Sequence, residues 1–132
     1  MILGMGIDSV EIARFAAWHT YNQKSLLRIL SSCEIDYCLS TPIKSAERFA
    51  ARFAVREAFY KALGHIPNIK PLPFLTVCKL IQLQKQPNGS DQLKIDWHQL
   101  INSPPTIKPH LSWSHTQTTA TAIVILESET KF

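Results

Sequence analysis

The stretch SAERFAARFAVREAFYKALG, residues 45–64, predicts one long helix against which the rest of the chain must pack. Ser45 is a residue type that caps helix N-termini, and Pro42 lies just upstream of it. Gly64 follows as the C′ residue, where glycine ends many helices. We therefore expect a helix from Ser45 to Leu63.

One acidic residue lies on the apolar face of this helix. Phe49, Phe53 and Tyr60 project within about 40° of one another at helical spacing, and the same arc contains a glutamate, Glu57. A carboxylate there needs a compensating cation or metal, because burying an unpaired charge is costly. Lys61 lies one turn later and could form an i,i+4 ion pair with Glu57. Helix geometry alone leaves this salt bridge and a metal site equally open.

A basic stripe lies on another side of the helix. Arg48, Arg52 and Arg56 are spaced i, i+4 and i+8, which spreads them over about 80° of the circumference. A charged stripe is usually a solvated face. No acid of the helix neutralises this arc, so a phosphate or an acidic partner is the competing interpretation.

The N-terminal segment predicts a second site residue. Residues 2–7 are apolar and contain glycines, which indicates a buried strand ending at Asp8. An acid directly after a buried strand would lie at the open end of that strand, where a ligand could reach it. The alternative is that Asp8 caps a following helix, as aspartate often does.

The remaining patterns mix helices and strands without regular βαβ alternation. In chain order they predict short helical turns over residues 9–40, a proline-rich loop over 66–73, strands over 74–84 and 92–97 with a turn at 87–90 between them, a short helix over 96–102, and an antiparallel hairpin of strands 108–113 and 119–126. We therefore expect one α+β domain over residues 1–132, with a small antiparallel sheet packed against one long helix and shorter helices.

Composition narrows the class of protein without identifying a partner. The 132 residues suit one domain, their 45% hydrophobic content suits a packed core, and a net charge of +4 suits an acidic or phosphorylated partner or nucleic acid. Cys33, Cys38 and Cys78 form no CxxC pair, which favours reduced thiols in a cytosolic protein. We expect no signal peptide and no membrane span, and therefore a soluble, cytoplasmic protein.

A compact polar segment lies at the tip of the predicted hairpin. Residues 112–116 read SWSHT, and two hydroxyls and an imidazole in a turn offer donors for a phosphate or an adenine edge. A single histidine in a turn is more often an ordinary surface residue. The spacing does not form a Ser/His/Asp triad.

Together these stretches resemble a known family. GIDSVEI (residues 6–12), RFAARFAVREAFYKALG (48–64) and SWSHT (112–116) resemble the three signature segments of the bacterial holo-acyl-carrier-protein synthases, which are small 4′-phosphopantetheinyl transferases. Their order and separations fit, and LLRILSSCEIDYC (26–38) extends the similarity over nearly the whole chain.

The resemblance implies a reaction and a metal. The family transfers the 4′-phosphopantetheine group of coenzyme A to a serine of an acidic apo-acyl carrier protein in fatty acid biosynthesis, and releases adenosine 3′,5′-bisphosphate. At the matching positions, Asp8 and Glu57 would bind Mg²⁺, and Lys61 would contact the coenzyme A phosphates. The physics agrees, because Mg²⁺ prefers oxygen ligands and commonly takes one or two carboxylates plus substrate phosphates.

The resemblance also implies binding surfaces. The candidate coenzyme A-binding residues are Arg52, Lys61, Gly64, Ser114, His115 and Thr116. Arg14 and Arg28 would meet the carrier protein. The family implies a homotrimer with active sites at subunit interfaces, and neither nucleic acid nor a membrane as partner. Glu34 and Asp36 are candidates for activating the water that deprotonates the serine.

The helix gives a physical reason for association. Apolar residues also cover the side roughly opposite Phe53, namely Ala51, Val55, Ala58 and Ala62. A helix that is apolar on most sides must be buried, and a chain of this length has few elements to cover it. Association with other copies would cover it.

Some positions depart from the family pattern. Arg56 stands where the family usually has lysine, which puts a phosphate contact there in doubt because the two side chains differ in donor geometry. After Gly64 the chain continues His-Ile-Pro, and the Gly-Lys-Pro turn usual in the later sheet is unclear near residues 87–90. The alternative function is a non-catalytic basic module that binds nucleic acid or a phosphorylated ligand; a structural oligomerisation domain would explain only the apolar helix.

Overall fold

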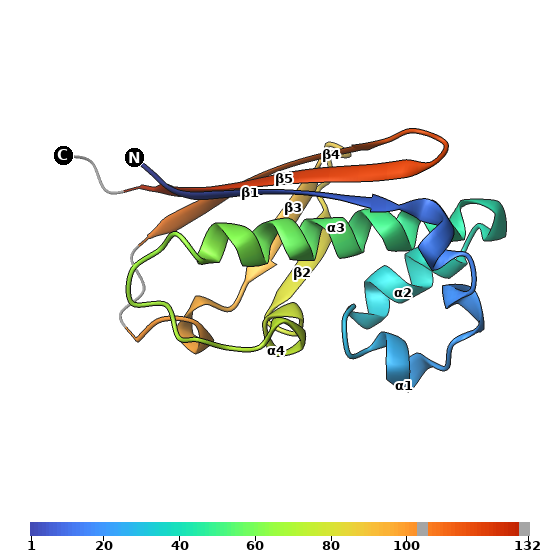
Figure 1. Cartoon of the computed structure of the whole chain (residues 1–132), viewed down its shortest axis with the longest axis horizontal. Coiled ribbons are helices and arrows are strands. Elements are labelled where there is room, and N and C mark those ends of the chain that lie inside the picture. The colour runs from blue at the N-terminus through green and yellow to red at the C-terminus, as the bar shows by residue number, and fades with distance from the viewer. Residues whose placement is uncertain (103–105, 130–132) are drawn as a thin grey trace.

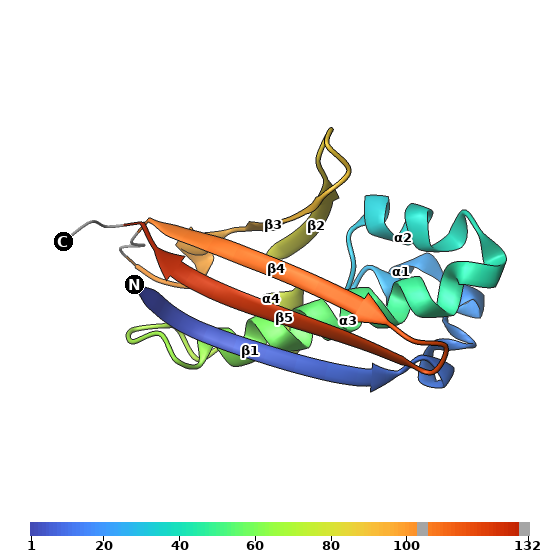
Figure 2. The ribbon, with the colours of Figure 1, turned by 90° about the horizontal axis from the view of Figure 1, so that it is seen from above.

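The computed structural model describes residues 1–102 and 106–129 and has the expected α+β fold. A three-stranded antiparallel sheet, in the order β1-β5-β4, lies along the long helix α3 (Figure 1). The bounds are β1 Ile2–Glu11, β4 Ile107–His115, β5 Thr119–Ser128 and α3 Ser45–Leu63. Seen from above, the three strands run side by side over α3 (Figure 2). The predicted hairpin of residues 108–113 and 119–126 is confirmed as β4 and β5.

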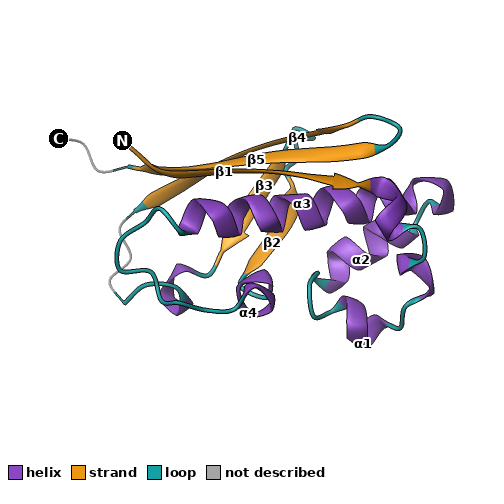
Figure 3. Cartoon of the chain, viewed as in Figure 1, coloured by secondary structure: helices purple, strands orange, loops and turns teal. Residues whose placement is uncertain are grey.

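Shorter elements complete the domain (Figure 3). A two-stranded sheet pairs β2 with β3, antiparallel and in register from Ile81↔Ile95 to Lys85↔Asp91. The bounds are β2 Ile81–Lys85, β3 Asp91–Ile95, α1 Gln23–Leu26, α2 Ser32–Leu39 and α4 Phe74–Cys78, with single 3-10 turns at Ile12–Phe15, Trp18–Thr20, Pro42–Lys44 and Trp97–Gln99. Within the described residues, none of the helices has the length and apolarity needed to cross a membrane.

The contact between β1 and α3 is unusually close because two glycines form it. A Cβ atom added at Gly6 would lie 2.0 Å from the carbonyl oxygen of Ala58, and one added at Gly4 would lie 2.2 Å from that of Ala62. The strand backbone therefore rests directly on the helix backbone. Since side chains alternate along a strand, the face that carries these glycines also directs Asp8 toward α3.

Several local predictions were wrong. Residues 74–84 do not form one strand, because α4 occupies Phe74–Cys78 and β2 begins only at Ile81. Pro73 is the N-cap of α4, and its carbonyl accepts a hydrogen bond from the Val77 N–H at 3.1 Å, which starts a helical turn. The predicted strand 92–97 ends at Ile95. The predicted helix over residues 96–102 is reduced to the 3-10 turn at Trp97–Gln99.

The helix ends also differ from prediction. The N-cap of α3 is Lys44, and Ser45 is the first helical residue, with a buried Oγ that has no hydrogen-bond partner. Gly64 is the C-cap with φ −60°, in the right-handed region, so it does not use the conformational freedom of glycine. The strand β1 continues to Glu11, which places Asp8 inside the strand and not at its end.

The physical reason given for association was also wrong. The side of α3 that carries Ala51, Val55, Ala58 and Ala62 is at most 1% exposed within the single chain. The sheet already covers this side, since Ala58 and Ala62 lie against the glycines of β1. The helix therefore needs no second copy to bury it.

Candidate active site

Asp8 and Lys61 are joined across the strand–helix contact. The Lys61 Nζ donates to Asp8 Oδ1 at 3.0 Å and to the carbonyl oxygen of Ile7 at 2.9 Å. The other carboxylate oxygen, Asp8 Oδ2, is buried and has no hydrogen-bond partner. Because a buried charged oxygen without a partner is costly, this atom calls for a cation or a donor from a ligand.

Glu57 lies one turn before Lys61 and close to Asp8. Burial raises the pKa of the Glu57 carboxyl above its ordinary value, and the negative charge of Asp8 raises it further. The positive charges of Lys61 and Arg14 act in the opposite direction. In the described part of the chain, the ion pair of Lys61 is with Asp8, so of the two interpretations left open for Glu57 the i,i+4 salt bridge is not the one formed.

The pair of carboxylates fits a hard divalent cation. Asp8 Oδ2 lacks a partner, and Asp8 and Glu57 repel each other electrostatically. Among the described residues, no group of three or more His, Cys, Asp and Glu side chains could hold a metal ion. A cation here would therefore have two protein ligands and fill its other positions with substrate oxygens and water, a pattern typical of Mg²⁺ and not of a structural zinc site.

The predicted nucleotide-binding turn is shorter than expected, because Ser114 and His115 are the last residues of β4 and pair with Thr121 and Ala120 of β5. His115 Nε2 contacts Glu47 Oε1 at 3.4 Å, and His115 Nδ1 lies 3.0 Å from the carbonyl oxygen of Thr116. Glu47 is ten residues before Glu57, which corresponds to about 15 Å along a helix axis. Across the sheet, Ser114 pairs with Thr121 and Thr121 pairs with Ser9, so one strand separates Ser114 from the neighbour of Asp8. Because cross-strand partners share a face, the Ser114 side chain lies with Ser9 on the face opposite to Asp8.

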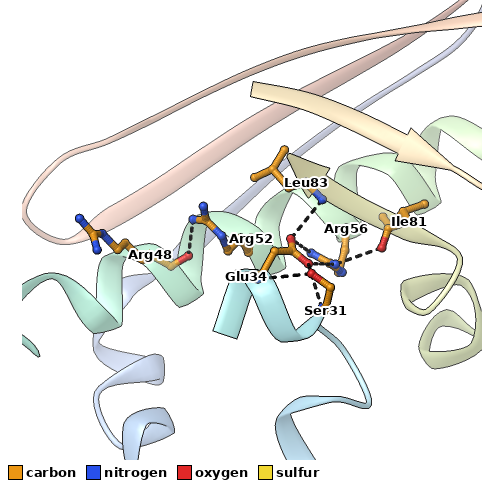
Figure 4. A network of polar contacts seen from close by, with 7 residues as sticks. All are labelled: Ser31, Glu34, Arg48, Arg52, Arg56, Ile81 and Leu83. Atoms are coloured by element: carbon orange, nitrogen blue, oxygen red, sulfur yellow. Dashed lines mark hydrogen bonds and ion pairs between the residues drawn. The ribbon is translucent and has the colours of Figure 1, made fainter. Parts of the chain in front are cut away.

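The arginine stripe divides into two environments (Figure 4). Arg56 is fully buried and forms a bidentate ion pair with Glu34, at 2.9 Å and 2.6 Å. The interpretation of Arg56 as part of a solvated or phosphate-binding face was therefore wrong. Glu34 is 2% exposed and bound to Arg56, so it is not available to activate a water. Asp36 is exposed on α2.

The other two arginines gather around an aromatic ring that sequence reasoning did not single out. The Arg48 and Arg52 guanidinium groups lie 4.0 Å and 4.7 Å from the centre of the Tyr37 ring, and the Lys85 ammonium lies 5.6 Å from it. Arg52 is 4% exposed, and its Nε has no partner. Arg52, Tyr37 and Lys85 line an open cavity of about 430 Å³.

The remaining candidate residues, Arg14, Arg28 and Gly64, lie in three different surroundings. The Arg14 guanidinium lies 5.9 Å from the centre of the Phe53 ring. Its positive charge also lowers the pKa of Glu57. Arg28 borders a separate cleft of about 240 Å³ whose lining includes Trp18, Tyr21 and Leu75. Gly64 lines a cavity of about 280 Å³ with Tyr60.

The Glu34–Arg56 pair predicts how stability depends on pH. Burial alone would raise the pKa of Glu34, but the Arg56 charge and hydrogen bonds from Arg56 and Ser31 outweigh it and hold the pKa below its ordinary value. A carboxyl with a lowered pKa stabilises the folded state above its unfolded pKa, about 4.3 for glutamate. This contribution is lost as the pH falls through the folded-state pKa.

We therefore expect Glu34→Gln to lower the free energy of unfolding by about 3–5 kcal/mol at neutral pH, because it leaves the Arg56 charge buried without a partner. The difference from the wild type should shrink as the pH falls and protonates Glu34 in the wild type. Urea unfolding at neutral and acid pH measures it. A difference of the same size at both pH values would contradict this electrostatic role.

Comparisons with known proteins agree over nearly the whole chain. Residues 4–123 match the family model described as the 4′-phosphopantetheinyl transferase superfamily. The chain is 37% identical over 131 residues to the holo-[acyl-carrier-protein] synthase of Treponema denticola, covering 96% of this chain and 99% of that protein. The corresponding protein of Trichlorobacter lovleyi is also 37% identical, over 97% of this chain and 99% of its own length.

Solved structures show the same fold. The holo-(acyl-carrier-protein) synthase from Bacillus anthracis, crystallised in complex with CoA (3′,5′-ADP), superposes with a TM-score of 0.72 at 31% identity, over 98% of this chain and 99% of that one. The Chronobacterium ammoniagenes ACPS–CoA complex superposes with a TM-score of 0.75 at 25% identity, over 96% and 97%.

Proposed function

The chain belongs to the 4′-phosphopantetheinyl transferase superfamily, and we propose that it transfers the 4′-phosphopantetheine group of coenzyme A to a serine of apo-acyl carrier protein. The products are holo-acyl carrier protein and adenosine 3′,5′-bisphosphate, in fatty acid biosynthesis. The observation that carries this proposal is the cluster of Asp8, Glu57 and Lys61, in which one carboxylate oxygen has no partner. Relatives of nearly equal length that are named holo-[acyl-carrier-protein] synthases support it.

The carboxylate pair would hold Mg²⁺ through Asp8 Oδ2 and an oxygen of Glu57. The ion, when bound, neutralises charge on the pyrophosphate of coenzyme A and polarises its β-phosphorus. Burial and the mutual repulsion of the two carboxylates support this assignment, because both favour binding of a cation.

Lys61 would stabilise the leaving group. An ammonium has three N–H donors, and two of them already go to Asp8 Oδ1 and the Ile7 carbonyl. The third is free to donate to a phosphate oxygen, since the Lys61 side chain is 51% exposed. The serine oxygen of the carrier protein forms a bond to the β-phosphorus, the bond from that phosphorus to the bridging oxygen breaks, and the serine proton passes to a nearby water.

We propose that the nucleotide half of the site comes from Arg52, Gly64 and the turn of Ser114, His115 and Thr116. The register of the sheet favours a segment donated by a neighbouring subunit, because the Ser114 side chain of the same chain lies on the face opposite to Asp8. A homotrimer with active sites at its interfaces would supply it.

The exposed face of the three-stranded sheet is a better candidate for a subunit interface than the long helix, which is already buried. All the labelled helices lie on one side of the three-stranded sheet (Figure 1). On its other face, Ile2, Met5 and Ile7 of β1 are 56%, 48% and 59% exposed, and Ile123 and Ile125 of β5 lie beside them in register. Adjoining apolar side chains that a chain leaves exposed mark surfaces that other proteins cover.

Intact-mass measurement tests the proposed function. Apo-acyl carrier protein incubated with coenzyme A, Mg²⁺ and this protein should gain the mass of one phosphopantetheine group. An unchanged mass, with a known transferase active on the same carrier protein, would overturn the proposal.

We also expect Arg14 and Arg28 to meet the acidic carrier protein. Arg28→Glu should raise the KM for carrier protein by about tenfold and leave the KM for coenzyme A nearly unchanged, because charges at the rim of an interface act mainly on encounter. Arg14→Glu should affect both constants, since Arg14 lies near Glu57. Steady-state kinetics with each substrate varied in turn measures this.

Lys94→Glu is the matched control, because it makes the same charge change at an exposed position of β3. Added salt should weaken the wild type more than Arg28→Glu, since screening acts on the attraction that the variant has already lost. A loss confined to coenzyme A affinity in Arg28→Glu would show that Arg28 belongs to the nucleotide site instead.

A further inference from the structure

The Glu34–Arg56 ion pair joins three elements at one buried point (Figure 4). Both side chains are at most 1% exposed. Beyond their bidentate contact, Glu34 Oε1 accepts from the Leu83 N–H at 3.3 Å, and Arg56 Nη2 donates to the Ile81 carbonyl at 3.2 Å. Glu34 Oε2 also accepts from the N–H and the hydroxyl of Ser31, both at 2.9 Å. The helices α2 and α3 and the strand β2 are therefore tied together by directional bonds.

Stability alone does not explain this arrangement. Burying two charges is costly, and apolar residues of similar volume at such a position often do as well or better. The cost is higher here because Arg56 Nε is buried without a partner. The surroundings include two buried thiols, Cys38 and Cys78, which are at most 1% exposed and lie close enough to interact with both charges. The ion pair differs from an apolar pair because its bonds are directional. The planar guanidinium group of Arg56 fixes both the distance and the orientation between Arg56 and Glu34.

The opposite side of α3 packs on the three-stranded sheet through small and apolar residues. There the helix meets β1 through Gly4 and Gly6, against the backbone of Ala58 and Ala62. Val124 and Leu126 of β5, both fully buried, belong to the same core as the helix. This apolar packing restrains the rotation of α3 without directional bonds, and the side that carries Arg56 adds bonds that fix direction as well as distance.

That rotation matters for the neighbouring residue, Glu57. A side chain lies about 5–6 Å from the helix axis, so a rotation of about 10° moves its end by about 1 Å. A misplacement of about 1 Å in a catalytic group can reduce a rate by about a hundredfold.

We propose that Glu34 and Arg56 are positioning residues, which hold α3 at the rotation where Glu57 faces Asp8. Arg56 does so through two elements at once, since it contacts Glu34 of α2 and the Ile81 carbonyl of β2. A lysine at position 56 would offer no planar fork and could not reproduce the bidentate contact. The consequence for the metal rests on the function proposed above.

The test replaces both charges by apolar groups of similar size, in the double variant Glu34→Leu/Arg56→Met. Its thermal midpoint should stay within a few degrees of the wild type, because no charge is left buried without a partner. Binding of Mn²⁺ in the presence of coenzyme A, followed by electron paramagnetic resonance, should weaken by about tenfold. The kcat for transfer should fall by about ten- to a hundredfold, with an unchanged KM for carrier protein.

Leu93→Ala is the matched control for a loss of stability alone. Leu93 is 3% exposed on β3, so its truncation should lower the thermal midpoint by leaving a cavity, with Mn²⁺ affinity unchanged. If the double variant does not fold, Arg56→Lys, assayed below its midpoint, should show the same weakening of Mn²⁺ binding to a smaller extent.

Wild-type Mn²⁺ affinity in the folded variants would overturn the proposal, and so would equal weakening in Leu93→Ala. A wild-type protein that neither binds Mn²⁺ nor transfers phosphopantetheine would overturn the proposed function instead.

Discussion

Replacing Glu57 with glutamine should reduce phosphopantetheine transfer by about a thousandfold or more while leaving the fold intact. A bound cation contributes several kcal/mol of charge stabilisation, and each 1.36 kcal/mol corresponds to about a tenfold change in rate. Glutamine keeps the size of the side chain and removes the charge that would hold the ion. Asp8→Asn should have a similar effect, and chelation by EDTA should reproduce it in the wild type.

The thermal midpoint gives this prediction a second readout. Asp8 and burial both disfavour the charged form of Glu57, so Glu57→Gln should leave the midpoint unchanged or raise it slightly in the absence of metal. Asp96→Asn, at an exposed position after β3, serves as the control and should keep full activity. A Glu57→Gln protein that retained most of its rate at ordinary Mg²⁺ concentrations would contradict a role of this carboxylate as metal ligand.

The second large effect concerns assembly. Ile7→Glu should convert a particle of three times the 14.9 kDa chain mass into single chains, because it places a charge on the exposed apolar face of the sheet. Transfer should fall by at least about tenfold, since the Ser114 side chain of the same chain lies on the face of the sheet opposite to Asp8. Light scattering at micromolar concentration, with an activity measurement on the same sample, tests both statements.

Ile43→Glu is the control for this change. Ile43 is 92% exposed on the 3-10 turn Pro42–Lys44, away from the sheet, so its replacement should alter neither mass nor activity. An active wild-type monomer would contradict active sites shared between subunits. An Ile7→Glu protein that kept its mass would show that the sheet face is not the interface.

The sequence was sufficient to predict the elements with strong periodicity or a signature motif. The long helix was predicted over its full extent from its apolar spacing, although Ser45 and Gly64 do not cap it in the way expected. Asp8, Glu57 and Lys61 were identified together through the motifs, and the structure places them in one cluster. The β4–β5 hairpin was predicted from two β-rich runs separated by a polar turn.

Contacts between distant segments could not be predicted in the same way. The partner of Lys61 depends on how closely β1 approaches α3, which two glycines determine. The partner of Arg56 is 22 positions away, on α2. One local signal could have indicated a structural role for Glu34, because Ser31 and Glu34 have the spacing of a capping box and form one in the structure.

The segment 74–84 shows that short apolar runs can be assigned to the wrong type of secondary structure. Its apolar residues alternate well enough for a strand, yet the first five form α4 after Pro73. Short apolar runs do not distinguish a helical turn from a strand by periodicity, and burial of Val77 and Cys78 against the core decides the outcome.

The alternative of a basic nucleic-acid-binding module has lost its main support. It depended on three arginines forming a free stripe along the helix. Arg56 is neutralised by Glu34 in the core, so the three arginines do not form a free stripe.

Anomalous diffraction from crystals grown with Mn²⁺ and coenzyme A would test the metal site most directly. We predict one anomalous peak within coordination distance of both Asp8 Oδ2 and a Glu57 oxygen, with Lys61 still bonded to Asp8 Oδ1. A peak elsewhere, or no peak and a Glu57–Lys61 ion pair in its place, would contradict a metal site built from these two carboxylates.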